Sequence, residues 1–175
     1  MRHAPGLLLI GLVSAVLSIP VSAQRVRVSP HETHEFDVDG AHISITYGRP
    51  SKKGRVTWGT LVPSEKWWMP GADEATTIVT NKAIVIGGLT MPAGEHTIYA
   101  LMDEKSPKLI INKETGQFHT VYHPNLDLGR VDLTMRKIDP IVEMLTFEVK
   151  RREGGGGVLM LSWDDREYSV NFAVK

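Results

Sequence analysis

Alternation of apolar and polar residues with a period of two constrains this chain more than any other feature. In residues 41–47, the side chains of Ile43, Ile45 and Tyr47 fall on one face of an extended segment. No segment of helical period and appreciable length interrupts the pattern. It recurs at 75–80, 82–86, 95–102, 108–112, 130–138, 144–151, 158–163 and 168–174. These segments predict an all-β protein of nine or ten strands.

Turn signals separate the predicted strands. The clearest are Gly87-Gly88, Pro92-Ala93-Gly94, Lys105-Ser106-Pro107 and the glycine run from Gly154 to Gly157, which fits a hairpin tip. Short strands at uneven spacing favour a two-sheet, mainly antiparallel β-sandwich over a barrel. The exception to the pattern is at Ser29-Pro30-His31-Glu32, which has the cap, proline and acidic residue of a helix start and predicts one helical turn.

The first residues have the composition of a secretory signal peptide. A short basic start precedes an apolar run over 7–19, and Val21-Ser22-Ala23 is a small-x-small cleavage site. The run is shorter than the roughly 20 residues that a membrane span requires. We therefore expect cleavage after Ala23 and a single mature domain, Gln24 to Lys175, that is periplasmic or secreted and not inserted in a membrane.

Composition narrows the classes of partner and chemistry. Twenty basic residues balance twenty acidic ones, so the overall positive charge of a nucleic-acid-binding protein is missing. The chain has no cysteine, which excludes thiolate metal sites, cysteine nucleophiles and disulfides. We therefore expect no nucleic-acid partner, and a domain that folds on its apolar core alone.

A family resemblance appears when short motifs are taken in order along the chain. The sequence resembles the DUF2911 family of exported bacterial proteins, and the resemblance implies a β-sandwich and export but no reaction. Two departures are Asp73, where relatives commonly have Asn, and Trp68-Met69-Pro70, where they often have an Arg-Thr pair. The motifs are Tyr47-Gly48-Arg49-Pro50-Ser51-Lys52-Lys53-Gly54-Arg55, Gly59-Thr60-Leu61-Val62-Pro63, Trp67, Gly71-Ala72-Asp73-Glu74-Ala75-Thr76-Thr77-Ile78, Met91-Pro92-Ala93-Gly94, Ile111-Asn112-Lys113 and Asp127-Leu128-Gly129-Arg130-Val131.

A basic turn, residues 49–55, overlaps the start of the longest segment that lacks strand alternation, residues 50–73. Arg49, Lys52, Lys53 and Arg55 place four cations in seven residues. Guanidinium groups match carboxylate and phosphate geometry, so one hypothesis is an anion site. The alternative is structural: Arg49 or Arg55 pairs with Asp73 or Glu74 and fixes the long loop.

Three of the four tryptophans lie in the same loop, where exposed rings can stack on sugars or other flat ligands. Adjacent residues of an extended segment point to opposite sides, so Trp67 and Trp68 cannot both face the core. We expect Trp67 inside and Trp68 exposed, and Trp163 in the core. The predicted ligand-binding residues are Arg49, Lys53, Arg55, Trp67, Trp68 and Glu74.

Histidines supply weak candidates for a metal site. His119 and His123 are four residues apart, which on an extended chain is about 13 Å and too far for one ion. His96 is predicted on a strand, more simply as a hydrogen-bonded or exposed residue than as a ligand. A zinc site would require three of His96, His119, His123, Glu74 and Asp127 to converge. No cofactor is favoured.

Three functional hypotheses follow. The favoured one is a non-catalytic binding domain for a small molecule or an envelope glycan. The second is a metal-dependent hydrolase that uses converging His and Glu side chains. The third is a structural or protein-interaction component of the cell envelope, which docks through the tryptophan loop.

Overall fold

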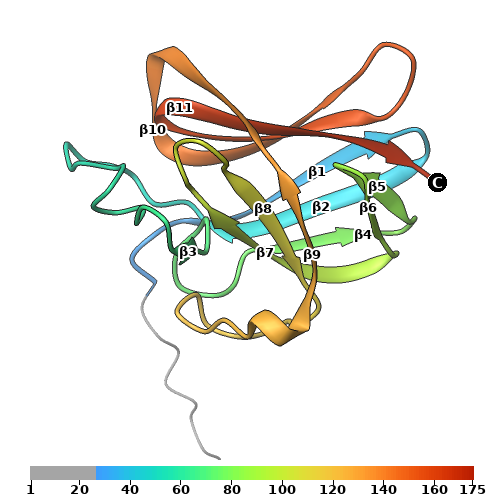
Figure 1. The fold of residues 1–175 in the computed structure, drawn as a ribbon, viewed down its shortest axis with the longest axis horizontal. Coiled ribbons are helices and arrows are strands. Elements are labelled where there is room, and N and C mark those ends of the chain that lie inside the picture. Colours follow the sequence, from blue (N-terminus) through green and yellow to red (C-terminus); the bar gives the residue numbers. More distant parts are fainter. Residues whose placement is uncertain (1–26) are drawn as a thin grey trace, which may run out of the picture.

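A computed structural model describes residues 27–175, which form two facing antiparallel sheets (Figure 1). In the first sheet the strand order is β1-β2-β4-β7-β8-β9, and the short strand β3 also pairs with β7. The predicted β-sandwich is therefore confirmed. The strands of this sheet are β1 (His31–Val38), β2 (Ala41–Gly48), β3 (Trp67–Trp68), β4 (Thr77–Thr80), β7 (Gly94–Leu101), β8 (Lys108–Asn112) and β9 (Asp127–Asp132).

The second sheet is dominated by one long hairpin that lies across the first sheet (Figure 1). Its strands are β10 (Thr134–Arg151), β11 (Gly157–Val174), β5 (Ile84–Ile86) and β6 (Leu89–Met91), in the order β10-β11-β5-β6. The hairpin tip falls in the predicted glycine run, where Gly154, Gly155 and Gly156 have φ values of 85°, 102° and 71°. A one-turn 3₁₀ helix, η1 (Pro124–Leu126), precedes β9.

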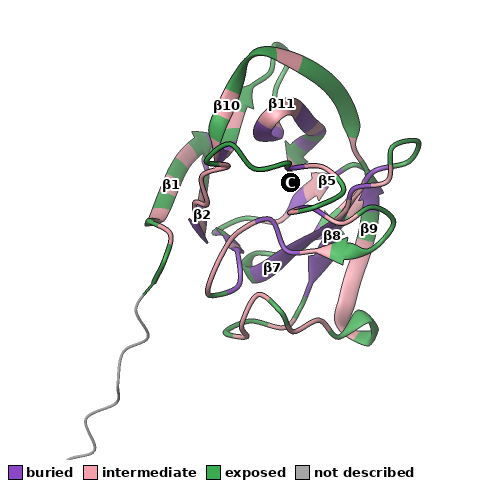
Figure 2. Ribbon diagram, turned by 90° about the vertical axis from the view of Figure 1, so that its left-hand side faces the viewer, coloured by how far each residue is buried: buried purple, intermediate pink, exposed green. Residues whose placement is uncertain are grey.

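The main core lies between the inner faces of the two sheets. Alternation places Ile43, Ile45 and Tyr47 of β2 inward, where they meet Phe147 of β10 and Trp163 of β11. The Tyr47 and Phe147 rings meet edge to face, with centroids 5.0 Å apart. Figure 2 shows the result: β7 is largely buried, whereas β10 is mostly exposed. The predicted core position of Trp163 is confirmed.

A second, smaller apolar cluster covers the opposite face of the first sheet. Tyr99 of β7 and Ile110 of β8 point outward and are buried by Met69 and Ala75, with Tyr122 packed against them. The covering residues belong to the segments before β4 and after β8. β7 is consequently buried on both faces, and loops carrying aromatic side chains are held against its outer surface.

Two local expectations differ from the structure. The predicted helical turn at Ser29–Glu32 is wrong, because His31 already begins β1 and Glu32 pairs with Tyr47 of β2. Cross-strand pairing and the inward side chains of β1 outweigh the local capping signal. The sequence also predicts separate strands where the structure has continuous ones. Residues 134–138 and 144–151 both belong to β10, and residues 158–163 and 168–174 both belong to β11, each of which runs for 18 residues.

The predicted signal peptide, residues 1–23, lies outside the described residues. Within residues 27–175, no helix has the length and apolar character needed to cross a membrane.

Candidate functional site

A hollow of about 360 Å³ lies on the outer face of the first sheet, beside the aromatic cluster. Its floor is apolar, and charged side chains lie at its margin. Trp67 is 38% exposed there, because pairing with Leu101 fixes β3 beside β7 with this ring on the outer side. The hollow is lined by Glu65, Lys66, Trp67, Leu101, Ile110, Tyr122 and Arg130.

Two further aromatic rings hold Trp67 in place. Its ring centroid lies 5.1 Å from that of Tyr122 and 5.9 Å from that of Tyr99, the latter edge to face. Tyr99 and Tyr122 are themselves 4.6 Å apart. The Tyr99 hydroxyl donates to the carbonyl of Val121 at 2.6 Å, which ties the loop carrying Tyr122 to β7. The aromatic surface is therefore formed before any ligand arrives.

A network of polar groups centred on Asp127 fixes the charged edge of the hollow. The Tyr122 hydroxyl donates to Asp127 Oδ2 at 2.8 Å, and Arg130 Nε and Nη2 donate to the same oxygen at 3.1 and 3.0 Å. The buried Asn112 amide donates to Asp127 Oδ1 at 2.9 Å. Burial and the bond to Asp127 raise the pKa of Tyr122 to about 12, so this phenol remains protonated at neutral pH.

Arg130 is consequently oriented rather than free to rotate. Its Nη2 also donates to the Tyr122 hydroxyl at 2.9 Å, and its side chain is 48% exposed. Within the part of the chain that the structure describes, no hydrogen bond occupies its Nη1 group. A guanidinium held on one side presents its remaining donors to an acceptor on a ligand.

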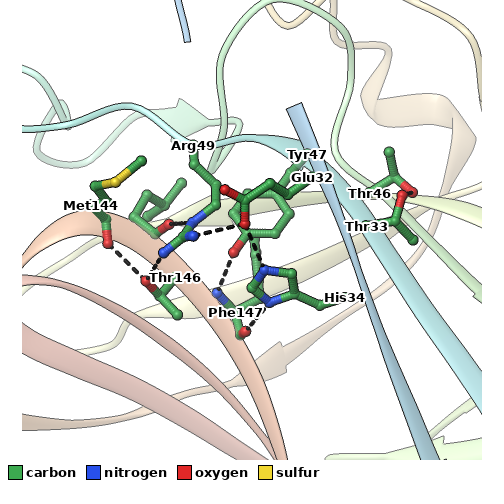
Figure 3. A network of polar contacts seen from close by, with 10 residues as sticks. Glu32, Thr33, His34, Thr46, Tyr47, Arg49, Met144, Thr146 and Phe147 are labelled. Carbon is green, nitrogen blue, oxygen red and sulfur yellow. Dashed lines mark hydrogen bonds and ion pairs between the residues drawn. The ribbon is translucent and has the colours of Figure 1, made fainter. Parts of the chain in front are cut away.

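Arg49, a predicted ligand-binding residue, does not line this hollow and belongs to a network between the two sheets (Figure 3). Its Nη1 donates to Glu32 Oε2 at 2.7 Å, Nη2 to Thr146 Oγ1 at 2.9 Å, and Nε to the carbonyl of Leu145 at 3.1 Å. The side chain is only 19% exposed. Arg49 therefore forms a structural ion pair, as the alternative to the anion-site hypothesis expected, but its partner is Glu32 rather than Asp73 or Glu74.

The same network continues through His34 (Figure 3). Its Nε2 lies 3.0 Å from Glu32 Oε2, and its Nδ1 lies 3.0 Å from the carbonyl oxygen of Phe147. The Phe147 N–H donates to the Tyr47 hydroxyl at 3.0 Å. The hydrogen bonds from His34 and then Arg49 lower the pKa of Glu32. These contacts join β1 and β2 to β10.

The rest of the basic turn is also folded onto the second sheet. Lys52 pairs with Asp164, and the Lys53 N–H donates to Glu143 Oε1 at 2.7 Å. Arg55 donates to the carbonyls of Lys52 and Ser51 at 2.9 and 2.6 Å. The Lys53 side chain is exposed, but it has no part in the aromatic hollow. The turn therefore does not gather its cations around one anion site.

Glu74 and Trp68 occupy two further places. Glu74 accepts from Arg27 at 2.9 Å and lies 2.9 Å from His31 Nε2, and the Arg27 bond lowers its pKa. Trp68 stacks on Trp163, with centroids 6.2 Å apart and planes 7° from parallel. The expected orientations are thus reversed: Trp67 is on the exposed side and Trp68 packs against the core. Only Trp67 of the six predicted residues lines the hollow.

The three histidine candidates do not meet. His119 Nδ1 donates to the Asp73 carbonyl at 2.7 Å, His123 Nδ1 is 2.8 Å from Glu114 Oε2, and His96 is buried on β7. Among residues 27–175, no group of three or more His, Cys, Asp or Glu side chains is placed to hold a metal ion. The convergence that the zinc hydrolase hypothesis requires is not found there.

His96 has an unusual environment for a titratable group. Its Nδ1 is buried and has no hydrogen-bond partner among residues 27–175. Burial lowers the pKa of His96 below its ordinary value. In the unfolded chain His96 therefore binds a proton near pH 6.5, whereas in the folded chain it binds one only at lower pH. The free energy of unfolding consequently falls as the pH drops through this range.

We expect the His96→Gln variant to lose less stability than the wild type between pH 7 and pH 5, as measured by urea unfolding. Each unit of difference between the folded and unfolded pKa corresponds to about 1.4 kcal/mol. The His42→Gln variant is the control with the opposite sign, because Asp37 raises the pKa of His42. Parallel curves for wild type and His96→Gln would refute this prediction.

The sequence model of a family described as "Protein of unknown function (DUF2911)" matches residues 29–172. The chain belongs to the DUF2911 family. Searches of the curated proteins and of the solved structures gave no match.

Residues of the DUF2911 motifs divide between scaffold and hollow. Tyr47 and Arg49 bond across the two sheets, whereas Arg130, in the motif 127–131, lines the hollow. Sequence reasoning did not select Tyr122 or Arg130 as site residues. The family motif at residues 127–131 contains Arg130 and could have indicated it. However, only the pairing of β8 with β9 brings Arg130 beside Trp67.

Proposed function

We propose that this DUF2911 protein is an exported, non-catalytic binding domain whose ligand, a small molecule or an envelope glycan, occupies the aromatic hollow. The observation that carries the proposal is the exposed Trp67 ring, fixed over an apolar floor and beside an oriented Arg130. Export rests on the signal-peptide composition of residues 1–23.

The size and lining of the hollow support this assignment. Small-molecule sites typically enclose about 300 to 1,000 Å³ and combine apolar surface with a few placed polar groups. Trp67 and Tyr122 offer flat faces for a ring, and the Trp67 N–H makes no hydrogen bond within residues 27–175. Holding such rings rigidly reduces the entropy lost on binding.

A binding role also agrees with the polar chemistry of the hollow. Asp127, the carboxylate bonded to Arg130 at the edge of the hollow, already accepts from Asn112, Tyr122 and Arg130. A carboxylate with these partners has little capacity left to act as a general base. Burial and the bond to Asp127 keep the Tyr122 phenol in its protonated form. These groups are arranged to hold a ligand rather than to move protons.

We expect Trp67→Ala to weaken ligand binding about 30-fold, the effect of losing a central aromatic contact worth about 2 kcal/mol. The measurement is native mass spectrometry of the protein incubated with soluble envelope extract, with wild type and variant compared for a retained adduct. Val79→Ala, which shortens an exposed side chain on β4, is the control. Trp67→Phe should retain most of the binding, because a flat ring remains.

Three results are informative. An adduct lost only from Trp67→Ala supports the proposal. An adduct that both proteins retain equally places the ligand elsewhere and refutes it. A multiple of the chain mass in place of a small adduct would instead favour the protein-interaction hypothesis.

A further inference from the structure

A second hollow, of about 400 Å³, lies beside the aromatic one. Glu65 lines both hollows, so the two adjoin at this side chain. The two together are an elongated site with one aromatic half and one polar half. The polar half is lined by Ser64, Glu65, Asp103, Glu104 and Lys105.

The polar half is rich in hydrogen-bond acceptors. Asp103 Oδ1 accepts from the N–H groups of Lys105 and Ser106 at 2.7 and 2.9 Å, which lowers the pKa of Asp103. This carboxylate therefore stays ionised, and its Oδ2 makes no hydrogen bond within residues 27–175. Glu104 is 78% exposed and lies 3.7 Å from Arg166. The carboxylates of Glu65, Asp103 and Glu104 can therefore accept hydrogen bonds from donors on a ligand.

The aromatic half has the opposite requirement. Lys66 and Arg130 line it, and Arg130 Nη1 is available to an acceptor. A basic peptide would satisfy the carboxylates of the polar half but would be repelled by these two cations. Hydroxyl groups serve both halves, because each hydroxyl donates one hydrogen bond and accepts others. A sugar ring also has the flat C–H face that stacks on an aromatic ring.

We infer that the ligand is an oligosaccharide of at least two units, with one ring stacked on Trp67 and Tyr122 and the next in the hollow of Asp103 and Glu104. This inference rests on the proposed function and makes it more specific. Each hydroxyl that donates to an ionised carboxylate makes a charge-assisted bond, which is stronger than a bond between neutral groups. Affinity must therefore rise with chain length from one unit to two.

The test is isothermal titration calorimetry with size series of one to four units of glucose, mannose, galactose and N-acetylglucosamine. We expect a disaccharide to bind at least tenfold more tightly than its monosaccharide. The double variant Asp103→Asn/Glu104→Ala, whose residues line only the polar half, should reduce the disaccharide affinity to the monosaccharide level and leave monosaccharide binding unchanged. Glu153→Ala, at the exposed hairpin tip, is the matched control. Glucosamine oligomers test whether an ammonium donor replaces a hydroxyl.

The outcomes separate this inference from the proposed function. Equal affinity for one and four units, or an equal loss for both in the double variant, overturns the two-unit site. If Trp67→Ala still abolishes binding in that case, the proposed function stands. Unchanged sugar binding by Trp67→Ala overturns both. Failure of every sugar to bind overturns the oligosaccharide assignment, and the adduct experiment then decides the proposed function.

Discussion

The Gly48→Ala variant is expected to lose about 3 kcal/mol of unfolding free energy, at the upper end of the usual cost of overpacking. A Cβ at this position would lie 2.3 Å from the Ala72 carbonyl oxygen and 3.0 Å from its carbon. The obstacle is backbone, which has no alternative rotamer. The end of β2 or the segment before β4 must therefore shift, and His31, 3.2 Å away, restricts the movement.

Urea unfolding at pH 7 measures this loss. Gly54→Ala is the control, because Gly54 has a φ of 70° but nothing within 4 Å of an added Cβ. That variant should lose only about 1 to 2 kcal/mol, the cost of a left-handed conformation for a residue with a Cβ. A loss below 1 kcal/mol for Gly48→Ala would show that the contact with Ala72 yields easily.

Arg49→Met is expected to cost about 2 to 3 kcal/mol. Removing one partner of a buried ion pair costs about 3 to 5 kcal/mol, and the partial exposure of Glu32, at 36%, reduces this. The variant removes the donors that Arg49 supplies to Thr146 and the carbonyl of Leu145, and it leaves Glu32 with His34 as its remaining partner. Arg49→Lys should recover part of the loss, because one ammonium cannot reproduce the three directions of the guanidinium.

The Arg49 contribution is measured by urea unfolding of a double-mutant cycle with Glu32→Gln. Arg55→Met is the control, since Arg55 is exposed and bonds only to carbonyls of its own turn. We expect that variant to change stability by less than about 1 kcal/mol. Additive effects of Arg49→Met and Glu32→Gln would contradict the coupling described here.

The β architecture was predictable because alternation is a local property. Ile43, Ile45 and Tyr47 point inward wherever the strand lies, so a period of two is enough to identify the core face. The short sequence motifs correctly identified the DUF2911 family. Neither source specified that β3 pairs with β7, which determines which tryptophan of the pair is exposed.

The hollow itself depends on contacts between distant parts of the sequence. Trp67, Tyr122 and Arg130 meet because β8 places β9 two strands from β7, and no local pattern encodes that order. Arg49 illustrates the same limit. A structural pair was anticipated, but its partner Glu32 lies on the neighbouring edge strand, which the capping signal at residues 29–32 had suggested was helical.

The contacts of Arg49 with residues 145 and 146 also have a kinetic meaning, because these partners are separated by 96 and 97 positions along the chain. This junction between the sheets cannot form until nearly the whole polypeptide is available. Proteins dominated by such non-local pairings fold on the millisecond-to-second scale. The apolar faces of the first strands, β1 and β2, therefore stay exposed until the β10–β11 hairpin packs against them.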